Sequence, residues 1–407
     1  MTPTTSPTGR AAESGSPAVF LSAAEASGDW AGALLATALR RKRPALQLFG
    51  LGGARMAAAG VHLVEETSHW GAIGVFDALR TIPRAWAGLR RARAHLAGNP
   101  ADVVVLIDSG GVNIPFARMV RKLGPRILYY LPPGSWSRKS RNHTIQNLAD
   151  VIATPFAWSK ETLAGGRARV EWVGHPVLET VRPRLSPQEA RRHYGIEPDR
   201  SVLALAPGSR EQEMGFVLPI LAEAAARLVA RIEGLQLLVP VSNPIFEQHI
   251  RDAFQQRGLE AILLHGMEYD ALQLAEAAAV CSGTATLEFA CLRVPMVIVY
   301  RAGIATTFQY VLFRGILGGQ RYAGMPNIIA QREIVPELLR RYATPEAIAC
   351  ELGSLLTDQE RRARVRADLD DVVRALGTEG ASERTAELVL GLLASAPHVP
   401  RAATAGT

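Results

Sequence analysis

The chain has 407 residues, of which 48% are hydrophobic and 20% are charged, and its mean hydropathy is +0.08. This composition excludes a wholly disordered chain, and the length predicts two cores, each of about 150–200 residues. The longest apolar runs, such as Gly234–Phe246, are too short to span a bilayer, and the first residues show no secretory signal. The three cysteines have no CxxC spacing, which predicts neither a disulfide framework nor a zinc site and fits a reducing cytoplasm.

The net charge is +7, and it comes almost entirely from arginine. Such an excess is compatible with nucleic acid, an anionic membrane surface, a phosphorylated substrate or a biased base composition of the gene. Aromatic residues are not interleaved with basic ones as in an RNA-binding platform. We therefore expect no nucleic-acid partner.

Apolar strand-like runs alternate with longer helical patterns along the chain, which predicts parallel βαβ units and an α/β fold. The expected strands of the first half are Ala18–Ala23, Leu46–Gly50, Val103–Asp108, Arg126–Leu131, Val151–Thr154 and Arg169–Val173. Those of the second half are Val202–Ala206, Leu235–Val241, Ala261–Leu264, Ala279–Cys281 and Pro295–Tyr300. The expected helices include Asp29–Arg41, Ala54–Ala59, Pro115–Leu123, Pro183–Arg192, Met214–Arg231, Phe246–Gln256, Tyr269–Ala277, Thr286–Leu292 and Ser382–Leu393.

Two features of the first half lie where strands end, which is where α/β folds bind ligands. In the turn Ala24–Asp29, small residues let a ligand approach the backbone, and Ser27 or Asp29 is expected to cap the next helix. Asp108 ends a strongly apolar strand, where a carboxylate is costly without a partner. It is a candidate base or orienting residue, and a plain cap is the alternative.

Two turns of the second half suit phosphate binding. Pro207-Gly-Ser-Arg210 follows a strand, and its backbone N–H groups and Arg210 predict an anion cradle. Ser282-Gly-Thr-Ala-Thr-Leu-Glu288 opens a helix whose positive end suits a diphosphate, with Glu288 placed to bind a ribose hydroxyl. The alternatives are a solvated arginine and a first-turn glutamate that favours the helix dipole.

Other motifs are weak. The turn Gly50-Leu-Gly-Gly53 lacks the last glycine of a dinucleotide fingerprint, so we expect it to be structural. Asp368-Leu-Asp370 has the DxD spacing of metal-dependent sugar transferases but lies in an arginine-rich helical stretch, where a solvated face is expected. Two basic amphipathic stretches, Trp70–His95 and Phe308–Arg321, suit an anionic lipid or an acyl chain, and ordinary core helices are the alternative.

Taken together, the motifs resemble the lipid-A-disaccharide synthases, a family of GT-B glycosyltransferases. The matching stretches occur in the family's order, and they are Ala23–Leu35, Phe49–Gly60, Gly71–Leu79, Val103–Asn113, Val173–Glu179, Leu205–Met214, Cys281–Arg301 and Met325–Leu339. The resemblance implies two Rossmann-like domains that face each other across a cleft, with the C-terminal helix crossing back to the N-terminal domain. The implied boundaries are 17–176 for the acceptor domain, 177–372 for the donor domain and 373–395 for the helical segment, with disordered tails at 1–16 and 396–407.

The resemblance also implies the reaction. UDP-2,3-diacylglucosamine gives its sugar to the 6-hydroxyl of 2,3-diacylglucosamine 1-phosphate, releasing UDP and an acylated β-1,6 disaccharide 1-phosphate. An α-linked donor and a β-linked product imply an inverting transfer, for which we expect a base but no metal and no cofactor. The residues implied to bind the UDP-sugar are Ser27, Gly28, Pro207, Gly208, Ser209, Arg210, Ser282, Gly283, Thr284, Thr286, Glu288 and Asn327.

The acceptor half departs from the family pattern. The family typically reads IDAPDFN where this chain reads Ile107-Asp-Ser-Gly-Gly-Val-Asn113, so Asp108 is kept and the second aspartate becomes Gly111. We therefore expect Asp108 or Glu25 to act as the base. The acceptor or lipid is expected at Trp136, Arg138, Asn113 and Asp77.

The expected location is cytoplasmic, peripheral on the anionic inner face of the inner membrane. Four alternatives remain open at this point: transfer to another acceptor such as a lipid-linked muropeptide, UDP-sugar epimerisation, a non-catalytic homologue that binds UDP-sugar or lipid, and a dehydrogenase using Gly50–Gly53.

Overall fold

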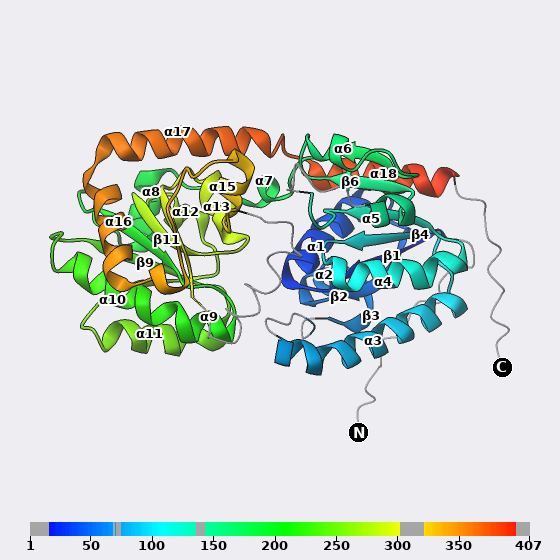
Figure 1. The fold of residues 1–407 in the computed structure, drawn as a ribbon, viewed down its shortest axis with the longest axis horizontal. Helices are drawn as coiled ribbons and strands as arrows, with labels where there is room; N and C mark the ends of the chain where they lie inside the picture. Colours follow the sequence, from blue (N-terminus) through cyan, green and yellow to red (C-terminus); the bar gives the residue numbers. More distant parts are fainter. Residues whose placement is uncertain (1–15, 68–69, 71–74, 136–142, 302–320, 396–407) are drawn as a thin grey trace, which may run out of the picture.

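The computed structural model describes residues 16–67, 70, 75–135, 143–301 and 321–395; the side chains of 75–81 and 143 lie outside this description. The tails expected to be disordered therefore fall almost wholly outside it, as does most of the Phe308–Arg321 stretch. Within the described residues, the chain forms two α/β units placed side by side, each built on a parallel sheet (Figure 1). The predicted fold class is confirmed.

The first unit carries a seven-stranded sheet in the order β3-β2-β1-β4-β5-β6-β7, with every neighbouring pair parallel. Its strands are β1 (Ala18–Ala23), β2 (Gln47–Gly52), β3 (His62–Glu66), β4 (Val103–Ile107), β5 (Arg126–Tyr130), β6 (Val151–Thr154) and β7 (Arg169–Trp172). Its helices are α1 (Ala26–Lys42), α2 (Ala54–Ala58), α3 (Val75–Gly98), α4 (Gly110–Val120), the 3-10 turn η1 (Arg121–Leu123), α5 (His143–Leu148) and α6 (Ser159–Thr162).

Helices cover both faces of this sheet, which explains why its central strands are apolar at every position. Phe20 and Leu106 face a core shared with α3 and α4, whereas Leu21 and Ile107 face a core shared with α1. The turn Gly50–Gly53 is partly strand, because β2 runs to Gly52. A Cβ at Gly50 would lie 1.9 Å from the Leu21 carbonyl oxygen, so this glycine serves close strand pairing, as expected from its incomplete fingerprint.

The second unit carries a six-stranded parallel sheet in the order β10-β9-β8-β11-β12-β13. Its strands are β8 (Val202–Ala206), β9 (Gln236–Val241), β10 (Ile262–His265), β11 (Ala277–Cys281), β12 (Met296–Tyr300) and β13 (Glu337–Leu339). Its helices are α7 (Val177–Thr180), α8 (Pro187–Tyr194), α9 (Glu211–Phe216), α10 (Leu218–Val229), η2 (Pro244–Phe246), α11 (Glu247–Gln255), α12 (Tyr269–Leu272), α13 (Ala285–Cys291), α15 (Met325–Ala330), η3 (Arg340–Tyr342), α16 (Pro345–Thr357) and α17 (Gln359–Ala375).

The helix predicted over Tyr269–Ala277 ends at Leu272, and two other predicted helices of this unit begin at other residues than predicted. The connecting helix begins at Pro187 rather than Pro183, because Ser186 and Glu189 form a capping box there. The helix predicted over Met214–Arg231 is two helices that meet at Val217, and Pro219 occupies the first turn of the second. Both errors concern where a helix begins, which capping side chains decide.

The last helix, α18 (Ala381–Ser395), returns to the first unit and lies beside α1, as expected from the resemblance (Figure 1). Ala386 and Val389 of this helix are buried in the core that α1 shares with the first sheet. On the surface, Lys42 pairs with Glu383 and Glu387. The first unit is therefore completed by the end of the chain.

Candidate functional site

The predicted site residues gather at the topological switch point of each sheet. In the first sheet, β1 and β4 are neighbours whose following helices depart in opposite directions, and Glu25 and Asp108 come directly after them. In the second sheet, β8 and β11 play the same role, and they are followed by Pro207–Arg210 and Ser282–Thr284. Ligands of open α/β sheets bind at such points because diverging helices leave a crevice there.

Glu25 and Asp108 form a carboxylate pair at the first switch point. Ser27 Oγ donates a hydrogen bond to Asp108 Oδ2 at 2.9 Å, and Ser109 Oγ lies 3.4 Å from Glu25 Oε1. Burial raises the pKa of both carboxyls, and the negative charge of Asp108 raises that of Glu25 further. Two neighbouring acids with raised pKa values are an arrangement suited to proton transfer.

The backbone at Asp108 is held in an unusual conformation. Asp108 and Ser109 have φ angles of 52° and 29°, a region that non-glycine residues seldom occupy. Asn113 Nδ2 donates to the carbonyl oxygens of Ile107 at 2.8 Å and of Asp108 at 3.2 Å, while its Oδ1 accepts from Ser22 Oγ at 2.7 Å. These bonds stabilise the turn that presents the Asp108 carboxylate.

This role corrects the sequence prediction for Asn113, which placed it among the acceptor or lipid contacts. Its side chain is fully buried, and both ends of its amide are bonded inside the protein. An amide engaged in this way is not available to a ligand, so Asn113 positions Asp108 instead.

The prediction that Ser27 or Asp29 caps α1 is also wrong. The N-cap of α1 is Glu25, without a side-chain cap, and Ser27 binds Asp108. Asp29 is buried and accepts hydrogen bonds from the backbone N–H groups of Gly53, Arg55 and Met56. It therefore caps α2, a helix that begins 25 residues later. Gly28 of the same turn is buried, and a Cβ there would lie 3.2 Å from that of Ala23.

At the second switch point, the turn predicted as an anion cradle already holds an internal carboxylate. Glu213 is buried, and its Oε2 accepts from the backbone N–H of Ser209 at 2.6 Å and of Arg210 at 3.0 Å. Gly208 has a φ of 115°, and a Cβ there would lie 2.2 Å from Glu213 Oε2. The two N–H groups thus bind Glu213 rather than standing open, which corrects the predicted cradle.

Arg210 remains available at this turn. Its Nη1 lies 3.2 Å from Glu213 Oε1, yet half of its side-chain surface is exposed. Glu213 thereby holds one nitrogen of the guanidinium, while the arginine side chain stays half exposed to solvent. Pro207 before it is buried.

The start of α13 is open at Gly283 and Thr284, which are exposed, whereas Thr286 is buried and its Oγ1 donates to the Gly283 carbonyl at 2.7 Å. Ser282 Oγ donates to the carbonyl of Ala323 at 3.2 Å. Thr286 therefore shapes the turn from inside, while the two exposed residues present the helix start.

Glu288 is partly buried and accepts a hydrogen bond from Tyr269 Oη at 2.8 Å. Burial raises the pKa of Glu288, and Arg55 of the first unit lowers it. In turn, burial and the neighbouring Glu288 keep Tyr269 protonated, since both raise its pKa. Sequence reasoning found the glutamate but not its tyrosine partner.

Asn327, predicted to bind the UDP-sugar, is fully buried and has no amide position left for a ligand. Its Nδ2 donates to the Val335 carbonyl and to Glu337, and its Oδ1 accepts from the N–H groups of Ile334 and Val335. It holds the chain from α15 to β13 in place, which corrects the prediction.

The two switch points face each other. The positive charge of Arg210 in the second unit lowers the pKa of Glu25 in the first, and Arg55 of the first unit acts likewise on Glu288 of the second. The ionisable groups of the two switch points are thus electrostatically coupled. This coupling connects a candidate base in one unit with an exposed arginine in the other.

Three of the predicted acceptor residues remain untested. Trp136 and Arg138 lie outside the described residues, and Asp77 lies in α3 where only the backbone is described. Gly111, in the position of the family's second aspartate, is exposed in the first turn of α4. A Cβ there would meet no atom within 4 Å.

The described residues contain no group of three or more His, Cys, Asp or Glu side chains that would hold a metal ion. Asp368 pairs with Arg332, and Asp370 pairs with Arg293, so the DxD residues form surface ion pairs as expected. Across the same described part of the chain, no helix combines the length and the apolar character that crossing a membrane requires.

A family model described as Lipid-A-disaccharide synthetase matches residues 19–391. The chain belongs to this family. The lipid-A-disaccharide synthase of Gloeothece citriformis is 35% identical to it over 383 residues, which cover 91% of this chain and 99% of that protein. The lipid-A-disaccharide synthase of Myxococcus xanthus is 36% identical over 380 residues, which cover 93% of this chain and 98% of that protein.

Solved structures agree on the fold. A co-structure of Staphylococcus aureus MnaA with UDP is similar with a TM-score of 0.61 and 12% identity, covering 94% of this chain and 99% of that one. The calicheamicin glycosyltransferase CalG4 is similar with a TM-score of 0.57 and 16% identity, covering 93% of this chain and 99% of that one. Acinetobacter baumannii MurG is similar with a TM-score of 0.52 and 15% identity, covering 92% of this chain and 99% of that one. The chain is thus a GT-B glycosyltransferase of lipid A synthesis, as predicted.

Proposed function

We propose that this chain transfers the sugar of UDP-2,3-diacylglucosamine to the 6-hydroxyl of 2,3-diacylglucosamine 1-phosphate, with inversion at the anomeric carbon. The observation that carries the proposal is that Glu25, which follows β1 at the first switch point, couples electrostatically to Asp108 of its own unit and to Arg210 of the other. A proton acceptor and a cation for the leaving group are both required by this reaction, and here they face each other.

Glu25 is the better placed of the two candidate bases. Its carboxylate is half-buried, and the positive charge of Arg210 in the other unit lowers its pKa. Asp108 Oδ2, by contrast, accepts a hydrogen bond from Ser27 Oγ. In the proposed step, Glu25 takes the proton of the acceptor hydroxyl while that oxygen attacks the anomeric carbon. Asp108 raises the proton affinity of Glu25 by its charge.

The bond from the anomeric carbon to the diphosphate breaks with its electron pair remaining on UDP. Arg210 supports this charge, because a guanidinium binds phosphate oxygens in a bidentate manner. The exposed start of α13 at Gly283 and Thr284 adds the positive end of a helix on the same side. Glu288 is expected to bind the ribose, with Tyr269 fixing its orientation. These groups act without a metal ion in the proposed step.

Both substrates of the proposed reaction carry acyl chains, so we propose that the enzyme works at the cytoplasmic, inner face of the inner membrane. The net charge of +7 supports attraction to an anionic surface, because polybasic proteins are drawn to acidic lipids. The association is expected to weaken as salt is added.

The test is to incubate the purified protein with both substrates in detergent and to identify the products by mass spectrometry. Stoichiometric release of UDP with the disaccharide 1-phosphate supports the proposal. UDP-sugar binding without product would instead support a non-catalytic homologue, an alternative favoured by the missing carboxylate at Gly111.

A further inference from the structure

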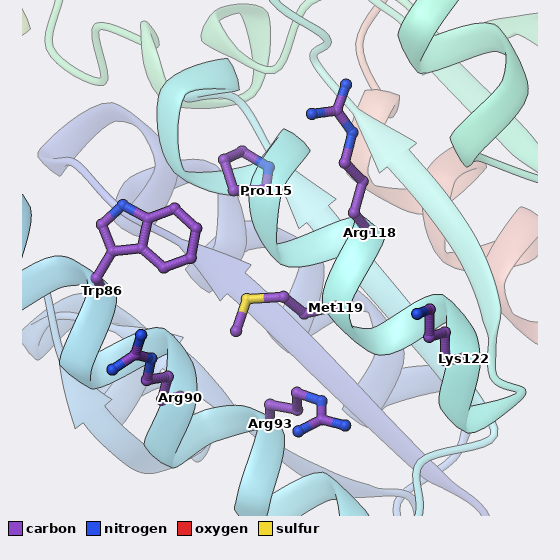
Figure 2. A pocket seen from close by; sticks show the side chains of 7 residues that line it. All are labelled: Trp86, Arg90, Arg93, Pro115, Arg118, Met119 and Lys122. Carbon is purple, nitrogen blue, oxygen red and sulfur yellow. The ribbon is translucent and has the colours of Figure 1, made fainter.

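A basic groove lies between α3 and α4, away from the switch points. It has a volume of about 690 Å³ and is lined by Trp86, Arg90, Arg93, Pro115, Arg118, Met119 and Lys122. Figure 2 shows Met119 in the middle of the groove, Trp86 at one end and Lys122 at the other. Two walls of a surface groove thus carry cations around an apolar centre.

The lining has one sign of charge. Arg90 and Arg93 come from α3, Arg118 from α4 and Lys122 from the following turn, and none of the described residues that line the groove is acidic. Among the residues that the structure describes, none of these four cations forms an ion pair with a carboxylate. By contrast, the neighbouring Arg91 and Arg121 pair with Glu65 and Asp150. Four cations at one groove, without a carboxylate partner in the described part of the chain, predict an anionic occupant.

Exposed apolar side chains border the cations. Trp86 has 44% of its surface exposed, Ile82 on the preceding turn 51%, and Leu123 beside Lys122 37%. A soluble anion gains nothing from such residues, whereas tryptophan and aliphatic side chains beside cations are typical of protein surfaces that enter the headgroup layer of a membrane.

We infer that the α3–α4 groove binds the phosphate headgroup of an anionic phospholipid and so fixes the face by which the enzyme meets the bilayer. Arg90, Arg93, Arg118 and Lys122 bind the phosphate, while Trp86, Ile82 and Leu123 enter the headgroup layer. This inference rests on the proposed function only in its membrane location. It adds the site and the chemistry of the lipid that it recognises.

α4 connects this face to the site. Its first residue, Gly110, follows Asp108 and Ser109, and Arg118 and Lys122 lie at its other end. At 1.5 Å per helical residue, the separation from Gly110 to Lys122 is roughly 18 Å. The groove and the first switch point are thus joined by a single helix and the turn that follows it.

The test compares the binding of the full-length protein to phosphatidylcholine vesicles with and without phosphatidylglycerol. The groove variant is Arg93→Gln/Arg118→Gln, and the matched control is Arg364→Gln/Arg366→Gln, two exposed arginines of α17 in the second unit. Each cation near an anionic surface contributes about 1 kcal/mol, so the groove variant should bind the anionic vesicles at least about tenfold more weakly. The control should bind within about twofold of wild type.

Trp86→Ala provides an independent variant without a charge change, with Ile245→Ala as an exposed apolar control in the second unit. We expect Trp86→Ala alone to weaken vesicle binding. Equal losses in the groove variant and its arginine control would overturn the inference, because bulk charge would then be sufficient.

Turnover of detergent-solubilised substrates separates this inference from the proposed reaction. The groove variants should retain wild-type turnover in detergent, since their residues lie outside the switch points. A protein that makes no disaccharide but binds anionic vesicles through the groove would refute the reaction and support the groove. A wild-type protein that shows no preference for phosphatidylglycerol would refute the groove and the membrane attraction, leaving the reaction intact.

Discussion

The two switch points differ in how their polar side chains are held. At the second, Glu213 binds two backbone N–H groups and one guanidinium nitrogen of Arg210, whose side chain stays half exposed. At the first, Ser27, Ser109 and Asn113 surround two carboxylates whose pKa values are raised, on a backbone with positive φ angles. The second switch point thus presents an arginine held by a buried glutamate, and the first presents a constrained acid pair.

The difference between the two switch points indicates which of them tolerates the substitution of a single side chain. The second switch point depends on a short local motif, Gly208 to Glu213, in which Gly208, Ser209 and Arg210 all contact the carboxylate of Glu213 or make room for it. The first depends on side chains from β1, α1, β4 and α4, so losing a carboxylate at Gly111 leaves the remaining network in place. The substitutions below test that contrast.

The largest effect is expected for Glu25→Gln, which removes the proposed base while keeping the size of the side chain. General-base catalysis contributes about 10²–10⁴-fold, so kcat should fall by that range. Steady-state UDP release measures it, with the exposed Glu260→Gln as the matched control. If Glu25→Gln keeps full activity and Asp108→Asn loses it, Asp108 is the base.

Arg210→Ala should lower kcat/KM by about 10²–10³-fold, because it removes the cation that stabilises the leaving diphosphate. Affinity for UDP alone, measured by calorimetry, should fall as well. Arg231→Ala, an exposed arginine of the same unit, is the control and should behave as wild type. Unchanged turnover in Arg210→Ala would place the diphosphate elsewhere.

Asn113→Ala and Asn327→Ala compare a buried amide of the first unit with one of the second. Both side chains are fully buried, and the oxygen and nitrogen of each amide are bonded inside the protein. Each substitution leaves buried polar groups without partners, at a cost of about 1–3 kcal/mol in the free energy of unfolding. Thermal or urea unfolding measures this loss. Only Asn113→Ala should also lower kcat in the folded enzyme, because only Asn113 holds the turn of Asp108.

The pH dependence reports on the acid pair. A base must be deprotonated to act, and Asp108 raises the pKa of Glu25. Asp108→Asn removes that negative charge, so the pKa of Glu25 should fall. The acidic limb of kcat/KM against pH should therefore move to lower pH in any residual activity. A limb that stays in place would mean that the titrating group is not Glu25.

The smallest effect is expected for Gly111→Asp, which restores the carboxylate typical of the family. The position is exposed and a Cβ there meets no atom within 4 Å, so the substitution should fold without strain. An acid in the first turn of α4, in place of glycine, should raise stability by about 0.5–1.5 kcal/mol. If Gly111→Asp also restores activity to Glu25→Gln, a carboxylate at either position serves as the base.

The strands and the turns that follow them could be predicted from the sequence, because buried parallel strands are apolar throughout and glycine-rich turns stand out between them. The roles of Asn113, Asn327 and Asp29 could not. Their partners lie on other elements, as when Asp29 caps a helix 25 residues away. A pattern along one segment carries no information about such contacts.

Glu213 was missed for a different reason. A glutamate three residues after a turn is usually a solvated first-turn acid, and only the close approach permitted by Gly208 brings its carboxylate onto the turn. The capping-box spacing was the available signal. The Gly111 departure, by contrast, was visible in the sequence, and the structure adds that the position is open.

The return of α18 to the first unit has a consequence for biosynthesis. The ribosome completes β7 more than 200 residues before α18 emerges, which at ordinary elongation rates is a delay of roughly 10–40 s. During that interval the nascent first unit lacks Ala386 and Val389 over α1 and leaves an apolar face unprotected. We expect a chaperone that binds apolar surfaces to bind the nascent chain during this interval. A chain truncated before α18 would keep this apolar face of the first unit exposed.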